Sequence, residues 1–198
     1  MGIELNYIEG QTPVDEDEKY GLRILSITTR EELDEFEQLN IEKAVEWTMR
    51  RKFSQEIIFT EQFVKELHLR MYDDVWKWAG KFRTTNKNIG VDWQIISVSL
   101  KQLLDDCKFW IESNTFPEEE IAVRFSHRIV CIHCFPNGNG RHSRLIADVI
   151  ISHIFNKPVF SWGSSNLVKQ GEVRKQYIDA IQSADKGNIL PLLYFARS

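Results

Sequence analysis

Apolar residues recur every three or four positions along much of the chain, which is the spacing of one face of an α-helix. The first such stretch follows Thr29, and the pair Thr29 and Glu32 predicts a capping box at a helix start. A second stretch begins near Phe63 and ends at Gly80, a residue type that often terminates helices. The residues at this spacing are Leu33, Phe36, Asn40, Ala44 and Trp47 in the first helix, and Phe63, Leu67, Met71, Val75 and Trp78 in the second.

The same spacing predicts five more helices, at residues 97–111, 117–132, 145–155, 171–184 and 188–197. Residues 81–96 differ, because Thr, Asn and β-branched residues surround a central glycine, and this composition favours a short β-hairpin. We therefore expect an all-α fold whose one strand-like insert is this hairpin.

Residues 1–28 are polar and without helical spacing, so we expect an N-terminal arm followed by one domain at residues 29–198. The 198 residues are 42% hydrophobic and 27% charged, as in an ordinary globular protein. A net charge of −4 gives no indication of a nucleic-acid partner, and no uninterrupted apolar run indicates a membrane segment. Three cysteines form no disulfide framework, so we expect a cytoplasmic protein.

The segment HCFPNGNGRHSR, residues 133–144, places basic side chains at the start of a predicted helix. Positive residues are disfavoured there unless an anion is bound, because the first backbone N–H groups already carry partial positive charge. Gly138 and Gly140 would let those N–H groups approach an anion, and Arg141 and Arg144 would share one helical face. His133, on the opposite side of the loop, could accept a proton. This pattern predicts a phosphate-binding site with a general base.

Other interpretations of these residues are weaker or stay open. The arginines could simply face solvent or pair with acidic neighbours. A P-loop is excluded because no strand precedes the loop and no Lys-Ser/Thr follows its last glycine. A zinc site would need more ligands at structural spacing than Cys131, Cys134, His127 and His133 supply, so we expect buried cysteines, and ordinary helix histidines at His68, His127 and His153.

The segment from His133 to Arg144 resembles the signature of the Fic (Fido) family, H-x-F-x-(Asp/Glu)-G-N-G-R-x-x-R, at every position except the acidic one. The stretch WAGKFRTTNKNIG at residues 78–90 resembles the part of that family leading into its flap, and residues 29–198 resemble its subfamily called mobile mystery protein B. The resemblance implies a Fic-type helical bundle that transfers AMP from ATP to a Ser, Thr or Tyr hydroxyl of a target protein.

The resemblance also implies roles for individual residues. His133 would be the general base, Phe135 would pack inward, and the loop residues Gly138, Asn139 and Gly140 would line the anion site. Arg141 and Arg144 would bind the β- and γ-phosphates. The backbone of the target would pair with a flap formed by Asn88, Ile89 and Gly90.

Asn137 stands where the family usually has an acidic magnesium ligand, so use of Mg²⁺ stays open. Family members can also be inhibited by a glutamate that binds the second arginine, or by a partner protein. Glu37 and Asn40 match that inhibitory segment only loosely, and we expect a solvated pair. The alternatives to adenylyl transfer are a Fic-type enzyme that uses another nucleotide or phosphate donor, and a catalytically weak nucleotide-binding regulatory module. Gly140 favours nucleotidyl transfer, because the phosphotransferase type carries Lys there.

Overall fold

The computed structural model describes residues 19–164 and 170–198, and it is built almost entirely of helices. They are α2 (Arg30–Met49), α3 (Gln55–Ile58), α4 (Glu61–Tyr72), α5 (Ile96–Glu112), α6 (Glu118–Ile132), α7 (Asn139–His153), α8 (Gln170–Asp185) and α9 (Leu190–Arg197), with a 3₁₀ turn at Trp93–Ile95. The expected all-α class is confirmed. None of the described helices has the length and apolar character needed to cross a bilayer.

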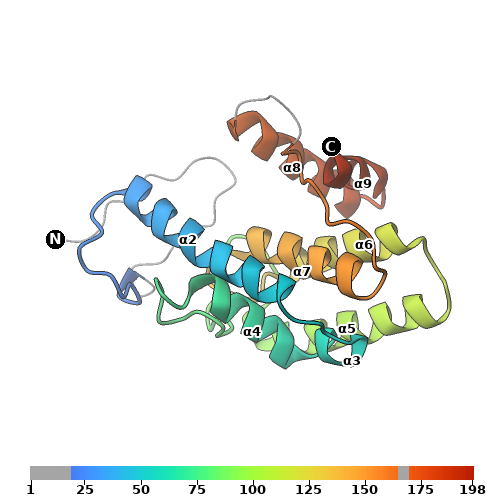
Figure 1. The fold of residues 1–198 in the computed structure, drawn as a ribbon, viewed down its shortest axis with the longest axis horizontal. Coiled ribbons are helices and arrows are strands. Elements are labelled where there is room, and N and C mark those ends of the chain that lie inside the picture. The colour runs from blue at the N-terminus through green and yellow to red at the C-terminus, as the bar shows by residue number, and fades with distance from the viewer. Residues whose placement is uncertain (1–18, 165–169) are drawn as a thin grey trace.

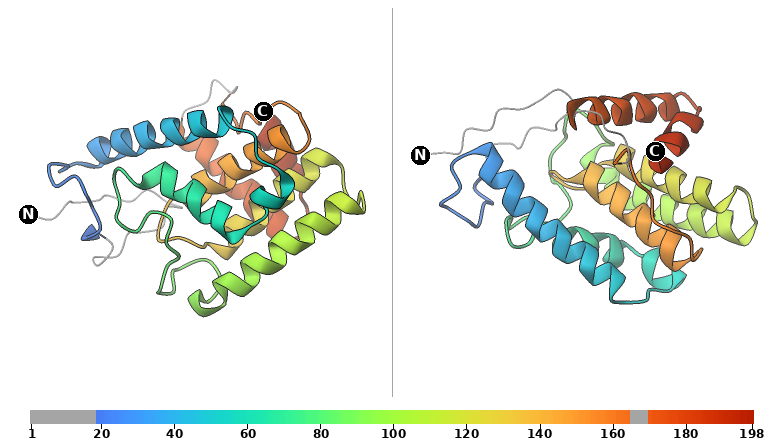
Figure 2. Two further views of the ribbon diagram at one scale, coloured as in Figure 1. Left: turned by 60° about the horizontal axis from the view of Figure 1, so that its bottom comes forward. Right: turned by 45° about the horizontal axis from the view of Figure 1, so that its top comes forward.

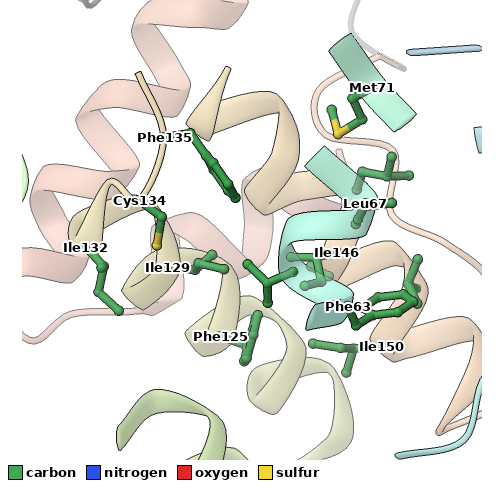
Figure 3. Packing of buried hydrophobic residues seen from close by; sticks show 14 of the residues in the cluster. Phe63, Leu67, Met71, Phe125, Ile129, Ile132, Cys134, Phe135, Ile146 and Ile150 are labelled. Carbon is green, nitrogen blue, oxygen red and sulfur yellow. The ribbon is translucent and has the colours of Figure 1, made fainter. Parts of the chain in front are cut away.

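Helices α6 and α7 form an antiparallel pair at the centre of the molecule (Figure 1). Helix α4 packs on α7, α5 packs on α6, and α2 lies along α4, as the two views of Figure 2 show. Apolar side chains of α4, α6 and α7 converge between these helices, among them Phe63, Leu67, Phe125, Ile129, Ile146 and Ile150 (Figure 3). Each fully buried side chain of this kind contributes about 1.5–3 kcal/mol of transfer free energy.

The predicted start of the first helix is confirmed by local interactions, whereas α7 begins at Asn139, earlier than the predicted residue 145. Thr29 accepts a hydrogen bond from the Glu32 N–H, and the Glu32 carboxylate accepts one from the Thr29 N–H, which completes the capping box. The second predicted helix is too long, however, since α4 ends at Tyr72 rather than near Gly80. The backbone N–H of Arg23 donates to the Val75 carbonyl, and the backbone N–H of Lys77 donates to the Gly21 carbonyl. The N-terminal segment therefore uses the backbone groups that a longer helix would need.

The β-hairpin expected at residues 81–96 is not confirmed, because the described backbone there consists of bends and the 3₁₀ turn. Its backbone hydrogen bonds run to the end of α6 and the residues after it. The backbone N–H of Arg83 donates to the Cys134 carbonyl at 3.0 Å, and the backbone N–H of Val91 donates to the Ile132 carbonyl at 3.3 Å. Of the predicted N-terminal arm, residues 1–18 lie outside the described part of the chain. Leu22 and Ile27 are buried against the core.

Candidate active site

The site is built on the loop that joins α6 to α7. Helix α6 ends at Ile132, and His133 follows in the left-handed conformation with φ 57° and ψ 61°. Gly138 is also left-handed, with φ 77°, and it immediately precedes the first residue of α7. A Cβ atom at Gly138 would lie 2.5 Å from the Tyr72 ring, so only glycine fits. These two turns aim the N-terminus of α7 back toward His133.

Two side chains hold the loop in this shape. Asn139 accepts a hydrogen bond from the Phe135 N–H at 2.9 Å and donates one to the Phe135 carbonyl at 2.8 Å. The Phe135 ring is fully buried and stacks on His68, with ring centres 3.7 Å apart. Asn139 therefore braces the loop with its side chain at the start of α7.

Two histidines near the loop support its structure. His68, which we expected to be an ordinary helix residue, is buried and its Nε2 hydrogen-bonds the Asn137 carbonyl at 3.1 Å. His142 is 1% exposed, its Nε2 contacts the Val64 carbonyl at 3.1 Å, and burial lowers its pKa to about 4. His142 is therefore neutral at pH 7 and faces the core, so the positive charge of the site comes from arginines.

Arginines from three helices gather at the N-terminus of α7. The Arg144 guanidinium lies 5.1 Å from the centre of the Tyr177 ring, and no described carboxylate forms an ion pair with it. Burial lowers the pKa of Arg174 in α8, and the nearby charges of Arg141 and Arg144 lower it further. Arg30 of α2 adds a further charge nearby. This concentration of cations suits a polyanionic ligand.

Arg141 is held by a buried carboxylate. Its guanidinium forms a 2.6 Å ion pair with Glu37, whose side chain also accepts a 2.7 Å hydrogen bond from the Trp76 indole N–H. Glu37 and Asn40 are each 4% exposed, so the expectation of a solvated pair was wrong. Asn40 instead joins α2 to the α4 end, through the Arg70 carbonyl and the Asp74 N–H. Among the described residues, Glu37 pairs with the first arginine of the motif and not with the second.

Asn137 directs its side-chain oxygen into the loop. The Oδ1 atom accepts a hydrogen bond from the Gly138 N–H at 2.6 Å. This amide oxygen therefore already serves the turn with one lone pair, and it carries no negative charge. Hard divalent cations prefer charged oxygen ligands. The loop as described is a poor fit for Mg²⁺ held by protein side chains.

His133 is 4% exposed, and burial lowers its pKa to about 4, with a further contribution from the positive charge of Arg83. The imidazole is therefore neutral at pH 7, which is the form that accepts a proton. The Arg83 guanidinium donates to the His133 carbonyl at 2.6 Å and also to the Thr85 and Val91 carbonyls. Arg83 thus ties the segment of residues 83–91 to the base.

The predicted flap lies next to the base. Asn88, Ile89 and Gly90 are exposed, with 50% of Ile89 accessible to solvent. A Cβ atom at Gly90 would lie 2.6 Å from the His133 Cβ, so the chain passes directly against the base there. The structure therefore brings His133, the α7 N-terminus, both motif arginines and this segment into one region.

Sequence reasoning missed several residues of this region. Arg83, Arg174, Tyr72 and the role of Glu37 have no spacing that relates them to the motif. Tyr72 is buried beside Gly138, and its hydroxyl has no hydrogen-bond partner among the described residues. The sequence offered one indication: Arg83 lies within the stretch WAGKFRTTNKNIG, which resembles the segment leading into the family's flap.

Comparison with known proteins relates the segment that carries this site to a family. Residues 58–151 match the model of the Fic/DOC family. The chain carries a Fic/DOC domain. The matched residues of this Fic/DOC domain run from the end of α3 into α7 and include the whole loop.

The curated relatives are similar to this Fic/DOC domain at low sequence identity. The chain is 25% identical over 163 residues to the protein adenylyltransferase Fic of Aedes aegypti, covering 80% of this chain and 31% of that protein. It is 28% identical over 145 residues to the Drosophila grimshawi protein of the same name, covering 71% of this chain and 28% of that one. The chain thus spans less than a third of the length of these curated relatives.

Solved structures show the same architecture. BepC, a Bartonella tribocorum effector protein crystallised with AMPPNP, superposes with a TM-score of 0.68 at 16% identity, covering 92% of this chain and 97% of BepC. Fic-1 of Caenorhabditis elegans superposes with a TM-score of 0.62 at 22% identity, covering 80% of this chain and 46% of that chain. At these identities the superpositions establish a common fold.

Proposed function

We propose that this protein transfers AMP from ATP to a Ser, Thr or Tyr hydroxyl of a target protein. The observation that carries the proposal is the placement of a buried, neutral His133 beside a helix N-terminus surrounded by Arg141, Arg144 and Arg174. A base and a polyphosphate site are the two parts that nucleotidyl transfer to a hydroxyl requires. The names of the curated relatives and the AMPPNP bound to BepC support the same activity.

In the proposed reaction, the neutral His133 imidazole accepts the proton of the target hydroxyl. The hydroxyl oxygen then attacks the α-phosphorus, and the bond from that phosphorus to the oxygen bridging to the β-phosphate breaks. Pyrophosphate leaves with the negative charge. The first N–H groups of α7 and the guanidinium of Arg144 stabilise this charge, because they are donors already fixed in place before the reaction begins.

We also propose that the target docks on the flap, where the exposed backbone at Asn88 and Ile89 would hydrogen-bond an extended target segment. Gly90 would keep that segment close to His133. Membership of the mobile mystery protein B subfamily and control by an inhibitor protein belong to the proposal as well. A cytoplasmic location agrees with three free cysteines, Cys107, Cys131 and Cys134.

Labelled ATP distinguishes this function from its alternatives. The purified protein is incubated with a candidate target mixture and with ATP labelled at either the α- or the γ-phosphorus. Adenylyl transfer leaves only the α label on protein, whereas phosphate transfer leaves only the γ label. If ATP binds but neither label is transferred, the protein is a nucleotide-binding module. Parallel reactions with other labelled nucleoside triphosphates identify a different nucleotide donor.

Gly140 provides a test of where the nucleotide binds. A methyl group at this position would contact only the Tyr177 ring, at 3.9 Å, among the described residues, so Gly140→Ala should fold normally. Alanine also favours a helical backbone more than glycine does, so the change should not destabilise α7. We expect ATP affinity to fall about tenfold or more, measured by calorimetry, because the methyl group occupies space along the α7 N-terminus.

The matched control is Gly171→Ala in α8, where a Cβ atom has nothing within 4 Å among the described residues. This change should also favour a helix, yet it should leave ATP affinity unaltered. Equal ATP affinity in the two variants would exclude the phosphate site at α7.

Asn137→Asp tests the role of a metal. One carboxylate oxygen can keep the hydrogen bond from the Gly138 N–H, and the other becomes a charged ligand for Mg²⁺. We expect Mg²⁺ to activate transfer at a concentration at least about tenfold lower, with a higher maximal rate. The measurement is the transfer rate across a magnesium titration for both proteins. A slower Asp variant at every magnesium concentration would show that the site works with an uncharged residue here.

A further inference from the structure

Three side chains that can bind a metal meet between α6 and the end of α8. His127 and Cys131 lie one helical turn apart on α6, and Asp185 ends α8. The His127 Nε2 and Asp185 Oδ1 atoms are 2.8 Å apart, the Cys131 Sγ and His127 Nε2 atoms 3.5 Å, and the Cys131 Sγ and Asp185 Oδ1 atoms 3.3 Å. The three ligand atoms therefore form a small triangle.

The size of the triangle matches a metal site. Bonds of about 2.0–2.3 Å from zinc to nitrogen, oxygen and sulfur, at tetrahedral angles, separate neighbouring ligand atoms by roughly 3.2–3.8 Å. Two of the three separations fall in this range, and the third, at 2.8 Å, is a hydrogen bond that a metal ion would replace by a small outward movement. Asp185 has a half-exposed side chain, so a fourth position can be filled by water.

The same three residue types could instead form a nucleophilic cysteine with a histidine base and an orienting aspartate. That arrangement requires the cysteine and the aspartate to contact different imidazole nitrogens. Here both contact Nε2. Burial, with a further contribution from Asp185, raises the pKa of the Cys131 thiol to about 12, which opposes thiolate formation in the absence of a cation. The three atoms converge on one point, as metal ligands do.

We propose that His127, Cys131 and Asp185 bind one zinc ion, which joins α6 to the end of α8. Thiolate and imidazole ligands favour zinc over magnesium or calcium. On binding, the Cys131 thiol loses its proton to solvent, and the zinc ion compensates the charges of the thiolate and the carboxylate. This site was not apparent in the sequence, because Asp185 lies 54 positions from Cys131.

The position of the site gives it a structural consequence. Helix α8 carries Arg174 and Tyr177 beside the motif arginines, while its packing on the body is made mainly through α9. A zinc ion would fix the C-terminal end of α8 directly to α6. We therefore expect zinc to slow amide hydrogen exchange across α8, independently of any catalytic activity.

Cobalt titration of the full chain tests the proposal, because a thiolate bound to Co²⁺ gives a charge-transfer absorption that water and carboxylate ligands do not. The protein is first stripped with a chelator, and folding is checked by circular dichroism. We expect one Co²⁺ per chain with this absorption, displaced by one equivalent of Zn²⁺. Asp185→Asn and His127→Gln should weaken binding at least tenfold.

Cys131→Ser is the test variant, and Cys134→Ser, which removes a thiol three residues away, is its matched control. Cys134 is buried in the core and contributes nothing to the triangle. We expect the charge-transfer absorption and the zinc-dependent protection of α8 to vanish in Cys131→Ser and to persist in Cys134→Ser. Absence of the absorption in the unmodified protein, or its persistence in Cys131→Ser, would overturn the site.

Discussion

Replacing His133 with alanine is expected to slow adenylyl transfer by about 10²–10⁴-fold, the usual contribution of a general base. ATP affinity should change little, because the phosphates are held by α7 and the arginines and not by the imidazole. Single-turnover transfer and calorimetry measure the two effects separately. His153→Ala, which removes an imidazole at the far end of α7, is the control and should leave transfer unaffected. Unchanged transfer in His133→Ala would remove the base from the mechanism.

The pH dependence gives the same assignment an independent test. Because burial and Arg83 lower the pKa of His133 to about 4, the base is mainly protonated only below that pH in the free enzyme. The acid limb of kcat/KM should therefore lie near pH 4 and not near 6.5, the ordinary histidine value. Circular dichroism at each pH separates this limb from acid unfolding. A limb near 6.5 would contradict a buried, neutral base.

Glu37→Gln is expected to lower the stability of the free protein and to increase the stabilisation that ATP gives. The substitution leaves the Arg141 charge uncompensated, although the Gln carbonyl can still accept the Trp76 N–H. Because Arg141 retains 32% exposure of its side chain, the cost should be about 1–3 kcal/mol of unfolding free energy and not the larger penalty of a fully buried charge. Phosphate groups would replace the lost carboxylate, so ATP should raise the melting temperature of the variant more than that of the original protein.

Glu46→Gln provides the matched control on the same helix. Glu46 pairs with Arg50 at the exposed end of α2, and such surface pairs contribute about 0–1 kcal/mol. Its loss should leave both the melting temperature and the ATP-dependent shift nearly unchanged. If Glu37→Gln gives an ATP shift equal to or smaller than that of the original protein, Arg141 does not meet the phosphates.

The sequence was informative wherever structure depends on neighbours along the chain. The capping box of Thr29 and Glu32 is made within one turn, and it was predicted correctly. The turn at Gly138 is local as well. The hairpin was expected from composition, but the hydrogen bonds of residues 83 and 91 go to residues 134 and 132, across about 40–50 positions. Tertiary contacts of this kind override the local preference for strand.

The candidate site divides in the same way. The motif residues from His133 to Arg144 are contiguous, so their types and spacing could be interpreted directly. Glu37 could not be interpreted, because its burial depends on Trp76 and Arg141, which lie on other elements. A glutamate on a helix surface and a glutamate beneath an arginine have the same sequence context. Only the packing of α2 on α4 distinguishes them.

The guanidinium of Arg83 contacts the carbonyls of both His133 and Val91, so the flap and the base share one cation. A proton added to His133 would place a second positive charge beside that guanidinium and weaken its hold on the flap. Thermodynamic linkage makes this coupling reciprocal, with the same free energy in both directions. A target that tightens the flap around Arg83 must therefore lower the proton affinity of His133 further. The binding of the hydroxyl-bearing partner and the protonation state of the group that deprotonates it are therefore two coupled equilibria.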